Sequence, residues 1–262
     1  MDSLTGKVVI ITGASEGIGA RLATLLARRG VRLALAARNE ARLRDAGGPA
    51  ALVVPGDLTD ASVRAGLIAK TLERWGQIDV LINNAGRGSY YTASTAPIDE
   101  ARDLFELNFF APLALAQLAA PHLRRTRGSI VNVSSIAGQI SLPWLPVYSA
   151  SKFALASITS TLRIELERDG VHVMGVFPGY VDTEFQAHAP GPRPPASVVK
   201  GKRYAVSPEQ CAAAILHGME RRKRTVVTPR AGWLLVWANR LFPRLVEMSL
   251  QSRDREGAVG LA

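Results

Sequence analysis

Two side chains that can exchange protons stand four residues apart in the segment PVYSASKFAL, residues 146–155. On a helix, positions i and i+4 lie on one face, so Tyr148 and Lys152 are expected to lie side by side. A nearby cation favours the ionised form of a phenol, whose ordinary pKa is about 10, and so makes the phenol more useful as an acid or base. The pair alone is weak evidence, because an ordinary helix start with an exposed lysine gives the same pattern.

Short β-branched runs alternate with longer segments of helical periodicity along the chain. The runs predicted to be strands are 7–11, 31–36, 51–54, 78–82, 129–133, 171–177 and 225–228. The segments predicted to be helices lie near 17–29, 60–75, 99–124, 148–168 and 208–221. This alternation is typical of βαβ units, and strands that are apolar on both faces are expected where helices cover both sides of a sheet. The pattern predicts an α/β fold with a parallel sheet, in a single domain over residues 1–262.

The composition is ordinary for a globular protein, with 47% hydrophobic and 21% charged residues among 262. Cys211 is the one cysteine, so no intrachain disulfide forms, and its apolar surroundings predict a small buried side chain. The four histidines lack the spacing of metal ligands, so no metal site is expected. The first apolar run leads straight into a glycine turn, and the longest uncharged run, 108–123, falls short of a membrane span. We therefore expect a cytoplasmic protein.

The net charge of +10 raises the question of an anionic partner. The arginines are spread along the chain, and the one dense run, ERRKR at 220–224, resembles a solvated face. No nucleic-acid-binding motif surrounds this run, so a nucleic acid is not an expected partner.

A glycine-rich turn joins the first predicted strand to the first predicted helix. Gly13, Gly17 and Gly19 form the pattern G-x-x-x-G-x-G. Glycines in this place allow a tight turn and a close backbone approach to a pyrophosphate, while the free N–H groups of the following helix attract the anion. The spacing is a variant of the usual dinucleotide fingerprint, so this is moderate evidence for a dinucleotide site.

The end of the second predicted strand bears on the choice between NAD and NADP. A site that prefers NAD commonly has an acidic residue here for the ribose 2′-OH, whereas this chain has Ala37 and then Arg38. An arginine can pair with a 2′-phosphate through forked hydrogen bonds, so NADP is favoured. Glu16, inside the glycine turn, puts a negative charge near the phosphates and weighs slightly against this preference.

Several short motifs follow one another along the chain, and they include the glycine turn and the pair Tyr148 and Lys152. They are TGASEGIG (12–19), GDLTD (56–60), NNAG (83–86), Asn108, IVNVSS (130–135), YSASK (148–152) and PGYVDT (178–183). Together they resemble the short-chain dehydrogenase/reductase family, over roughly residues 5–230. The resemblance implies a Rossmann-type doubly wound sheet of about seven parallel strands in the order 3-2-1-4-5-6-7, between two layers of helices.

The resemblance assigns roles to four side chains by position. Tyr148 resembles the catalytic acid/base, and Lys152 the residue that lowers its pKa and holds the nicotinamide ribose. Ser135, thirteen residues before Tyr148, resembles the group that hydrogen-bonds the substrate oxygen, and fits the family spacing better than Ser134. Asn108 resembles the fourth member, which supports a water-mediated proton relay.

The resemblance also implies the residues that hold the dinucleotide. These are Gly13, Ser15, Gly17, Ile18, Gly19, Arg38, Asp57, Leu58, Asn84, Ala85, Gly86, Tyr148, Lys152, Pro178, Gly179, Val181 and Thr183. In the reducing direction, hydride would pass from C4 of the nicotinamide to a carbonyl carbon. Ser135 and Tyr148 would then donate hydrogen bonds to the developing oxyanion, and Tyr148 would give its proton.

The substrate pocket is expected in the segments 87–94, 138–147 and 184–206, which are the least standard parts of the motif pattern. Five large side chains there would line an apolar pocket or simply pack in the core or on the surface: Tyr90, Tyr91, Leu142, Trp144 and Phe185. The loop 187–203 combines prolines with Arg193, Lys200, Lys202 and Arg203, and forms either a closing lid or a loose excursion.

The C-terminal extension, 230–262, carries apolar residues at helical spacing, broken by Arg240 and Arg244. The apolar residues are Trp233, Leu234, Trp237, Leu241, Leu245 and Met248. Such a segment caps the pocket or packs on the core, forms a subunit contact, or lies on a membrane through 230–250 as a basic amphipathic helix. Packing or a subunit contact is favoured. The family resemblance adds a homodimer or homotetramer built through the helices near 99–124 and 148–168.

Two classes of function remain. The first is an NADP(H)-dependent oxidoreductase acting on a ketone or secondary alcohol, with an NAD-dependent alcohol dehydrogenase as its variant. The second is a dinucleotide-binding module without turnover, which would be expected to lose Tyr148 or Lys152, and neither is lost. A basic membrane- or nucleic-acid-binding protein is a weaker third, which a steep salt dependence of binding would reveal. The substrate is not identified by these motifs.

Overall fold

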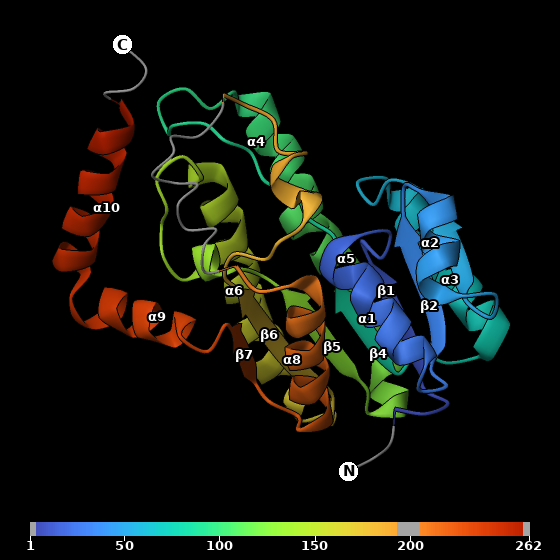
Figure 1. The fold of residues 1–262 in the computed structure, drawn as a ribbon. Coiled ribbons are helices and arrows are strands. Elements are labelled where there is room, and N and C mark those ends of the chain that lie inside the picture. The colour runs from blue at the N-terminus through green and yellow to red at the C-terminus, as the bar shows by residue number, and fades with distance from the viewer. Residues whose placement is uncertain (1–3, 193–204, 259–262) are drawn as a thin grey trace.

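The structure is a computed structural model that describes residues 4–192 and 205–258, apart from the side chains of residues 186 and 252–258. One sheet of seven parallel strands runs through the molecule in the order β3-β2-β1-β4-β5-β6-β7 (Figure 1). The strands are β1 Val8–Thr12, β2 Arg32–Ala37, β3 Leu52–Pro55, β4 Val80–Asn83, β5 Ser129–Val133, β6 His172–Pro178 and β7 Thr225–Thr228. The predicted fold and strand order are confirmed.

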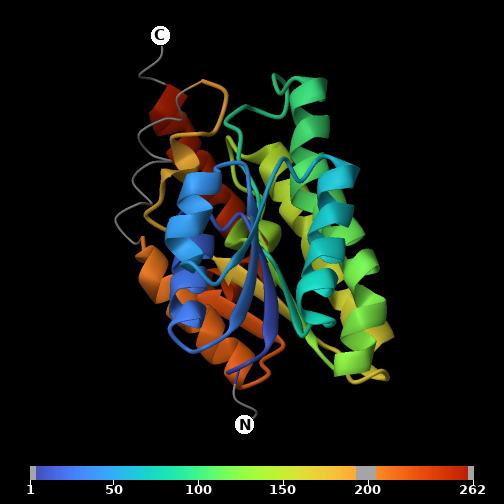
Figure 2. The same ribbon diagram turned by 90° about the vertical axis from the view of Figure 1, so that its right-hand side faces the viewer.

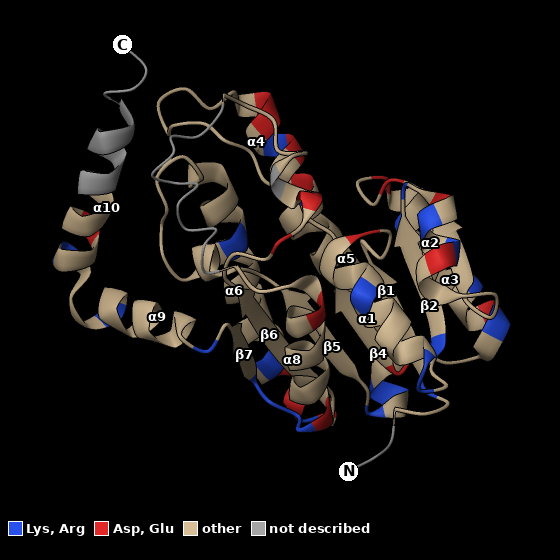
Figure 3. Ribbon diagram, in the orientation of Figure 1, with Lys and Arg blue, Asp and Glu red and all other residues tan. Residues whose placement is uncertain are grey.

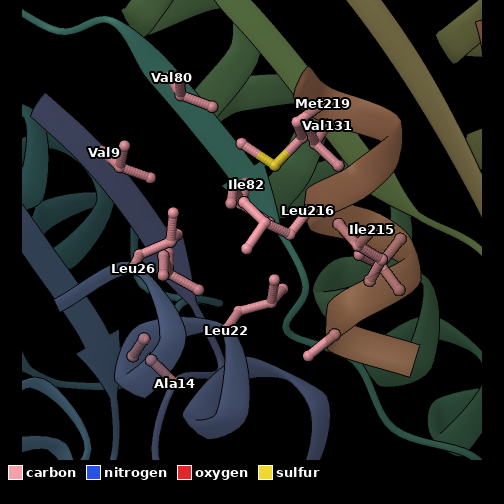
Figure 4. Packing of buried hydrophobic residues seen from close by; sticks show 14 of the residues in the cluster. Val9, Ala14, Leu22, Leu26, Val80, Ile82, Val131, Ile215, Leu216 and Met219 are labelled. Atoms are coloured by element: carbon pink, nitrogen blue, oxygen red, sulfur yellow. The ribbon is translucent and has the colours of Figure 1, made fainter. Parts of the chain in front are cut away.

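Helices cover both faces of the sheet (Figure 2). One layer holds α1 Gly17–Ala27, α2 Glu40–Gly47 and α8 Pro208–Glu220, and the other holds α3 Ala61–Trp75, α5 Ala111–Thr126 and α6 Pro146–Glu167. Alternate residues of a strand serve the two layers, as Val9 and Ile11 of β1 pack with α1 and α8 while Ile10 packs with α3 and α5. Figure 4 shows Leu22 and Leu26 of α1 facing Ile215 and Leu216 of α8 across this packing. Cys211 belongs to the same cluster, as predicted.

The predicted helix near 99–124 is divided in the structure. It consists of α4 Ile98–Phe105, a π-helical turn Glu106–Phe110 and α5. Among the described helices, the stretch Ile98–Thr126 is the one long and apolar enough to cross a membrane, but its inner face is covered by the sheet, with Leu115 and Leu123 at most 1% exposed. Helix α2 was not predicted, because its eight residues bury only Leu43 and Gly47 and carry little apolar periodicity.

Two helices follow the last strand. α9 Gly232–Leu241 and α10 Pro243–Ala258 lead away from β7, and α10 stands apart from the α/β body on the left of Figure 1. Their inner side meets the cleft described below. The predicted substrate loop 184–206 begins with a 3₁₀ turn, Glu184–Gln186, whereas residues 193–204, with Arg193, Lys200, Lys202 and Arg203, lie outside the described residues.

Candidate active site

A cleft of about 1540 Å³ opens at the carboxyl ends of the strands, on both sides of β1 and β4, where the strand order reverses. Ligands of open parallel sheets bind at such a reversal, because loops diverge there and leave a crevice. Of the predicted site residues, the cleft lining includes Gly13, Ser15, Gly17, Ile18, Arg38, Asp57, Leu58, Asn84, Ala85, Gly86, Ser135, Tyr148, Lys152, Pro178, Gly179, Val181 and Thr183. The other two, Gly19 and Asn108, are buried behind this lining.

The glycine turn and the segment 84–86 pack so closely that side chains are excluded between them. A Cβ atom on Gly13 would lie 2.8 Å from the Cα of Ala85, and the φ of Gly13 is +63°, which favours glycine. A Cβ on Gly19 would overlap the carbonyl oxygen of Gly13. Asn84 fixes the turn, since its Nδ2 donates to the carbonyl oxygens of Thr12 at 3.0 Å and Gly13 at 3.1 Å.

Helix α1 begins at Gly17 beside this turn. The residue before the helix is Glu16, and within the described chain its side chain accepts no hydrogen bond from the first N–H groups of α1. These N–H groups are therefore not satisfied by a capping side chain. A helix N-terminus with free N–H groups and a glycine turn that admits close approach form a suitable cradle for a pyrophosphate. The residues present therefore fit a dinucleotide.

Charged side chains gather where β2 and α2 meet the cleft. Arg38 is exposed and makes no ion pair or hydrogen bond with any residue of 4–192 or 205–258. Arg42, which the sequence analysis did not single out, pairs with Glu16 at 3.0 Å and approaches Glu184 to 3.7 Å. Asp57 accepts hydrogen bonds from the N–H and Oγ1 of Thr59, both at 2.9 Å. This end of the cleft holds one unpaired and one paired guanidinium.

Tyr148 and Lys152 lie at the other end of the cleft, in the first turns of α6. Helix α6 starts at Pro146, a residue suited to the first helical position, and this start puts both side chains on the inner face. The Nζ atom of Lys152 donates to the carbonyl oxygen of Val133 at 3.1 Å and lies 5.8 Å from the centre of the Tyr148 ring. Ser135 follows β5 and hydrogen-bonds the Tyr148 side chain. The structure thus brings three of the four predicted catalytic side chains together.

Burial dominates the pKa values of Tyr148 and Lys152. Burial raises the pKa of Tyr148 to about 12, and the hydrogen bond from Ser135 opposes this rise only in part, while nearby Tyr180 adds to it. Burial also lowers the pKa of Lys152 to about 8. This net shift is dominated by desolvation and does not isolate the effect of the neighbouring ammonium group, so the expectation that Lys152 lowers the pKa of Tyr148 stays a prediction. Tyr148 is a neutral phenol near pH 7.

Asn108 lies in the π-helical turn and is fully buried. Its Oδ1 accepts from the N–H of Arg87 at 2.9 Å, and its Nδ2 donates to the carbonyl oxygen of Arg87 at 2.9 Å and to Oγ of Ser151 at 3.1 Å. A Cβ on Gly86 would lie 3.0 Å from Oδ1 of Asn108 and 3.2 Å from Nζ of Lys152. Asn108 therefore fixes the segment 86–87 directly beside the ammonium group of Lys152.

Apolar side chains form the part of the cleft beyond Tyr148. Of the five large residues predicted for this pocket, Tyr90, Leu142 and Phe185 line the cleft, and the Phe185 ring meets the Tyr148 ring edge-on at 5.7 Å. Tyr91 and Trp144 lie outside the lining, joined by a hydrogen bond from the N–H of Tyr91 to the carbonyl oxygen of Trp144 at 3.2 Å.

The far wall of the apolar part is made by α9 and α10. These helices contribute Leu235, Ala238, Phe242, Leu245, Val246, Ser249 and Leu250 to the lining. Of the alternatives left open for the C-terminal extension, capping of the pocket is the one that the structure bears out. Periodicity indicated helices here, but it did not show which side of each helix faces the cleft.

The sequence matches a protein family model and individual known proteins over most of its length. The sequence profile of a family described as short chain dehydrogenase matches residues 7–192. The chain is 34% identical to 11-beta-hydroxysteroid dehydrogenase-like 4A of Arabidopsis thaliana over 258 residues, covering 94% of this chain and 84% of that protein. It is also 34% identical to dehydrogenase/reductase SDR family member 7B of Bos taurus, covering 95% of this chain and 82% of that protein.

Solved structures share the fold over nearly the whole chain. A short chain dehydrogenase/reductase from Burkholderia phymatum in complex with NAD superposes with a TM-score of 0.84 at 25% identity, covering 94% of this chain and 96% of that one. A short chain dehydrogenase from Burkholderia cenocepacia in complex with NADP has a TM-score of 0.80 at 28% identity, covering 95% and 99%.

Proposed function

The chain belongs to the short-chain dehydrogenase family of NAD(P)-dependent oxidoreductases that act on CH–OH groups, and we propose that it interconverts an apolar ketone and the secondary alcohol with NADP(H). The observation that carries this proposal is the cleft itself. One end is a glycine cradle with an arginine, Arg38, that has no partner among residues 4–192 and 205–258, and the other is an apolar chamber that begins at Tyr148.

The dinucleotide would be held along the cleft by the glycine turn, Asn84, Asp57 and the segment 178–183, with Lys152 beside its ribose. When bound, the nicotinamide supplies the hydride for reduction or accepts it in oxidation. Ser135 and Tyr148 both line the cleft and their side chains are hydrogen-bonded to each other, so their two hydroxyl groups are close enough to donate to one carbonyl oxygen. Tyr148 carries its proton near pH 7, so it can transfer that proton to the oxygen as negative charge develops.

Lys152 and Asn108 support this proton transfer. The ammonium group of Lys152 is buried against Val133 and faces the Tyr148 ring, so it stabilises the phenolate left after the proton has moved. Asn108 holds the backbone of Arg87 by two hydrogen bonds and lies next to that ammonium group. A water placed between Asn108 and Lys152 would return a proton from solvent to Tyr148, as the family resemblance implies.

The preference for NADP(H) over NAD(H) is supported by Arg38. Its guanidinium group is exposed at the cleft edge and has no competing partner in the described part of the chain, so a 2′-phosphate can pair with it. Arg42 stands one helical turn further on and would add a second cation, once released from Glu16. An NAD-dependent alcohol dehydrogenase is the alternative, because Glu16 puts a carboxylate beside the same pocket.

The apolar substrate is supported by the chamber lining. The lining includes side chains that carry no charge and therefore suit an apolar substrate: Leu142, Leu145, Phe185, Phe242 and Leu245. Both helices of the C-terminal extension contribute to this lining. Four of the relatives are named 11-beta-hydroxysteroid dehydrogenase-like, which points to bulky secondary alcohols as the first compounds to test.

The proposal also includes the oligomeric state and the cellular location of the protein. Four large apolar side chains are exposed on the outer side of α5, α6 and the π-helical turn before α5, which suits a homodimer or homotetramer: Phe110, Leu118, Phe153 and Ile164. The cytoplasm remains the location that the sequence leads us to expect. Light scattering of the purified protein would give the mass directly. A monomer that stays monomeric at high concentration would contradict this part.

The cofactor part is tested by titrating the protein with NADPH and with NADH, and repeating both with Arg38→Asp. We expect NADPH to bind at least tenfold more tightly, and the substitution to remove that difference while NADH binding changes little. Equal binding of the two cofactors would favour the NAD-dependent alternative. Binding of neither would leave a protein that cannot carry out hydride transfer, and would contradict the proposal.

A further inference from the structure

The outward face of the C-terminal helices is the most apolar exposed surface in the described part of the chain. Eight of the thirteen large hydrophobic side chains that are exposed there fall between residues 233 and 248, and five of these eight lie outside the cleft lining: Trp233, Leu234, Trp237, Leu241 and Met248. Exposed apolar side chains are usually scattered singly over a protein surface, so a patch of this size indicates a contact with another protein or with a membrane. This surface is distinct from the catalytic residues and from the α5–α6 face.

The two sides of helix α9 differ, since one packs against the body of the protein and the other is exposed. Its inner side is fixed to the body, because Val236 is buried, Ala238 lines the cleft, and Nδ2 of Asn239 donates to the carbonyl oxygen of Gln139 at 3.5 Å. Its outer side carries Trp233, Leu234, Trp237 and Leu241, of which Leu234 is 75% exposed. These four lie at helical spacing and outside the cleft lining, so the cleft does not account for them.

The charges on this surface are of one sign. Arg230, Arg240 and Arg244 are exposed around the apolar stripe, and Glu247 is the one acidic residue between 230 and 251. In Figure 3 the ribbon of α9 carries the blue of a basic residue and none of the red of acidic residues. A two-fold contact between copies of this chain would bring these arginines together without enough carboxylates to compensate them, since the same patch faces itself. Anionic groups on the other side would complement them.

The outer surface is also continuous with the mouth of the cleft. Phe242 and Leu245 line the cleft and are nevertheless 59% and 63% exposed, so they belong to both surfaces. An apolar compound that lies in a lipid layer would pass over these two side chains into the chamber that ends at Tyr148. A water-filled route would gain nothing from apolar side chains at its entrance.

From these observations we propose that α9 and the first turns of α10 dock on the surface of an anionic lipid bilayer, with Trp233, Leu234, Trp237 and Leu241 in the interface. Tryptophan suits that depth because its ring is apolar and its N–H remains wet. The arginines contact lipid phosphates, and the ten residues of α9 lie along the interface, because they are too few to span the bilayer. The inference goes beyond the proposed function and does not depend on the cofactor preference.

The test uses the full-length protein and sedimentation with vesicles of phosphatidylcholine alone or with one fifth phosphatidylglycerol. We expect binding to the anionic vesicles, weakened by salt, with a blue shift of tryptophan fluorescence. Trp237→Glu should lower the partition coefficient at least tenfold, and Arg240→Gln with Arg244→Gln about twentyfold. Ile98→Glu, at a residue 65% exposed on α4 and outside both the α5–α6 face and the C-terminal helices, is the matched control and should leave vesicle binding unchanged.

Three results would overturn the proposal. One is failure of the wild-type protein to bind anionic vesicles, and another is equal binding by Trp237→Glu and Ile98→Glu. The third is a wild-type dimer, seen by light scattering without lipid, that Trp237→Glu converts to a monomer, because a second copy would then cover the face. Thermal unfolding of each variant shows that it is folded. Arg240 lies 5.9 Å from the centre of the Trp237 ring, so Arg244→Gln alone, which leaves this contact in place, tests the charge requirement separately.

Discussion

Replacing Lys152 with methionine is predicted to make the protein more stable while it abolishes turnover. Lys152 is 3% exposed, and burial lowers its pKa from 10.5 to about 8. A difference of about 2.5 pKa units corresponds to about 3 kcal/mol by which the folded protein disfavours the charged form below pH 8. Methionine has similar length and no charge, but it loses the hydrogen bond to Val133, which costs about 1 kcal/mol. The net gain in unfolding free energy at pH 7 is about 2 kcal/mol.

The pH dependence of this gain identifies its cause. Between pH 8 and 10.5 the unfolded chain keeps a proton on Lys152 that the folded protein has lost, so the stability of the wild-type protein rises with pH. Lys152→Met lacks this rise, and its advantage should fall from about 2 kcal/mol at pH 7 to near zero at pH 9.5.

Urea unfolding of both proteins at pH 7 and pH 9.5 measures the two differences directly. Lys70→Met removes an exposed lysine on α3 and should change the free energy of unfolding by less than about 0.5 kcal/mol at either pH. A Lys152→Met protein that is less stable than wild type at pH 7, or whose advantage is the same at both pH values, would refute the reasoning. Burial of the Lys152 ammonium group would then not destabilise the folded protein.

Three further predictions concern the cofactor and the proton. Glu16→Gln frees Arg42 for a 2′-phosphate, so the affinity for 2′,5′-ADP should rise about fivefold relative to 5′-ADP; an unchanged ratio would argue against Arg42. Gly19→Ala should lower the melting temperature and weaken cofactor binding in fluorescence titrations, because its Cβ would overlap the carbonyl oxygen of Gly13; wild-type values would contradict the packing. The rate of alcohol oxidation should still rise with pH beyond 10, because Tyr148 loses its proton only near its pKa of about 12; a plateau below pH 10 would be inconsistent with this burial.

Much of the fold and of the site could be predicted from local patterns. The strands are apolar on both faces because both faces are buried, and this signal needs no knowledge of distant contacts. Gly13 could be predicted because it belongs to a glycine pattern between a strand and a helix, and the structure shows why glycine is needed there, since its positive φ and its closeness to Ala85 leave no space for a side chain. The i, i+4 spacing of Tyr148 and Lys152 predicts their shared helix face from the sequence alone.

The features that could not be predicted depend on contacts between distant segments. Arg42 enters the site through an ion pair with Glu16, 26 residues away, on the unpredicted helix α2. The direction of the Tyr148 pKa shift depends on how completely Phe185 and its neighbours cover the ring, which sequence spacing does not reveal. The inner side of α9 is likewise set by its contact with Gln139 of another segment.

The most direct test of the central claim is NADPH-dependent reduction of an apolar ketone by wild type and by Tyr148→Phe. The account predicts that kcat/KM falls by about 10² to 10⁴, because the proton donor is gone, whereas the fluorescence-detected Kd for NADPH changes less than about twofold. Reduction by Tyr148→Phe at the wild-type rate, with the cofactor bound equally well, would contradict the assignment of Tyr148 as the proton donor.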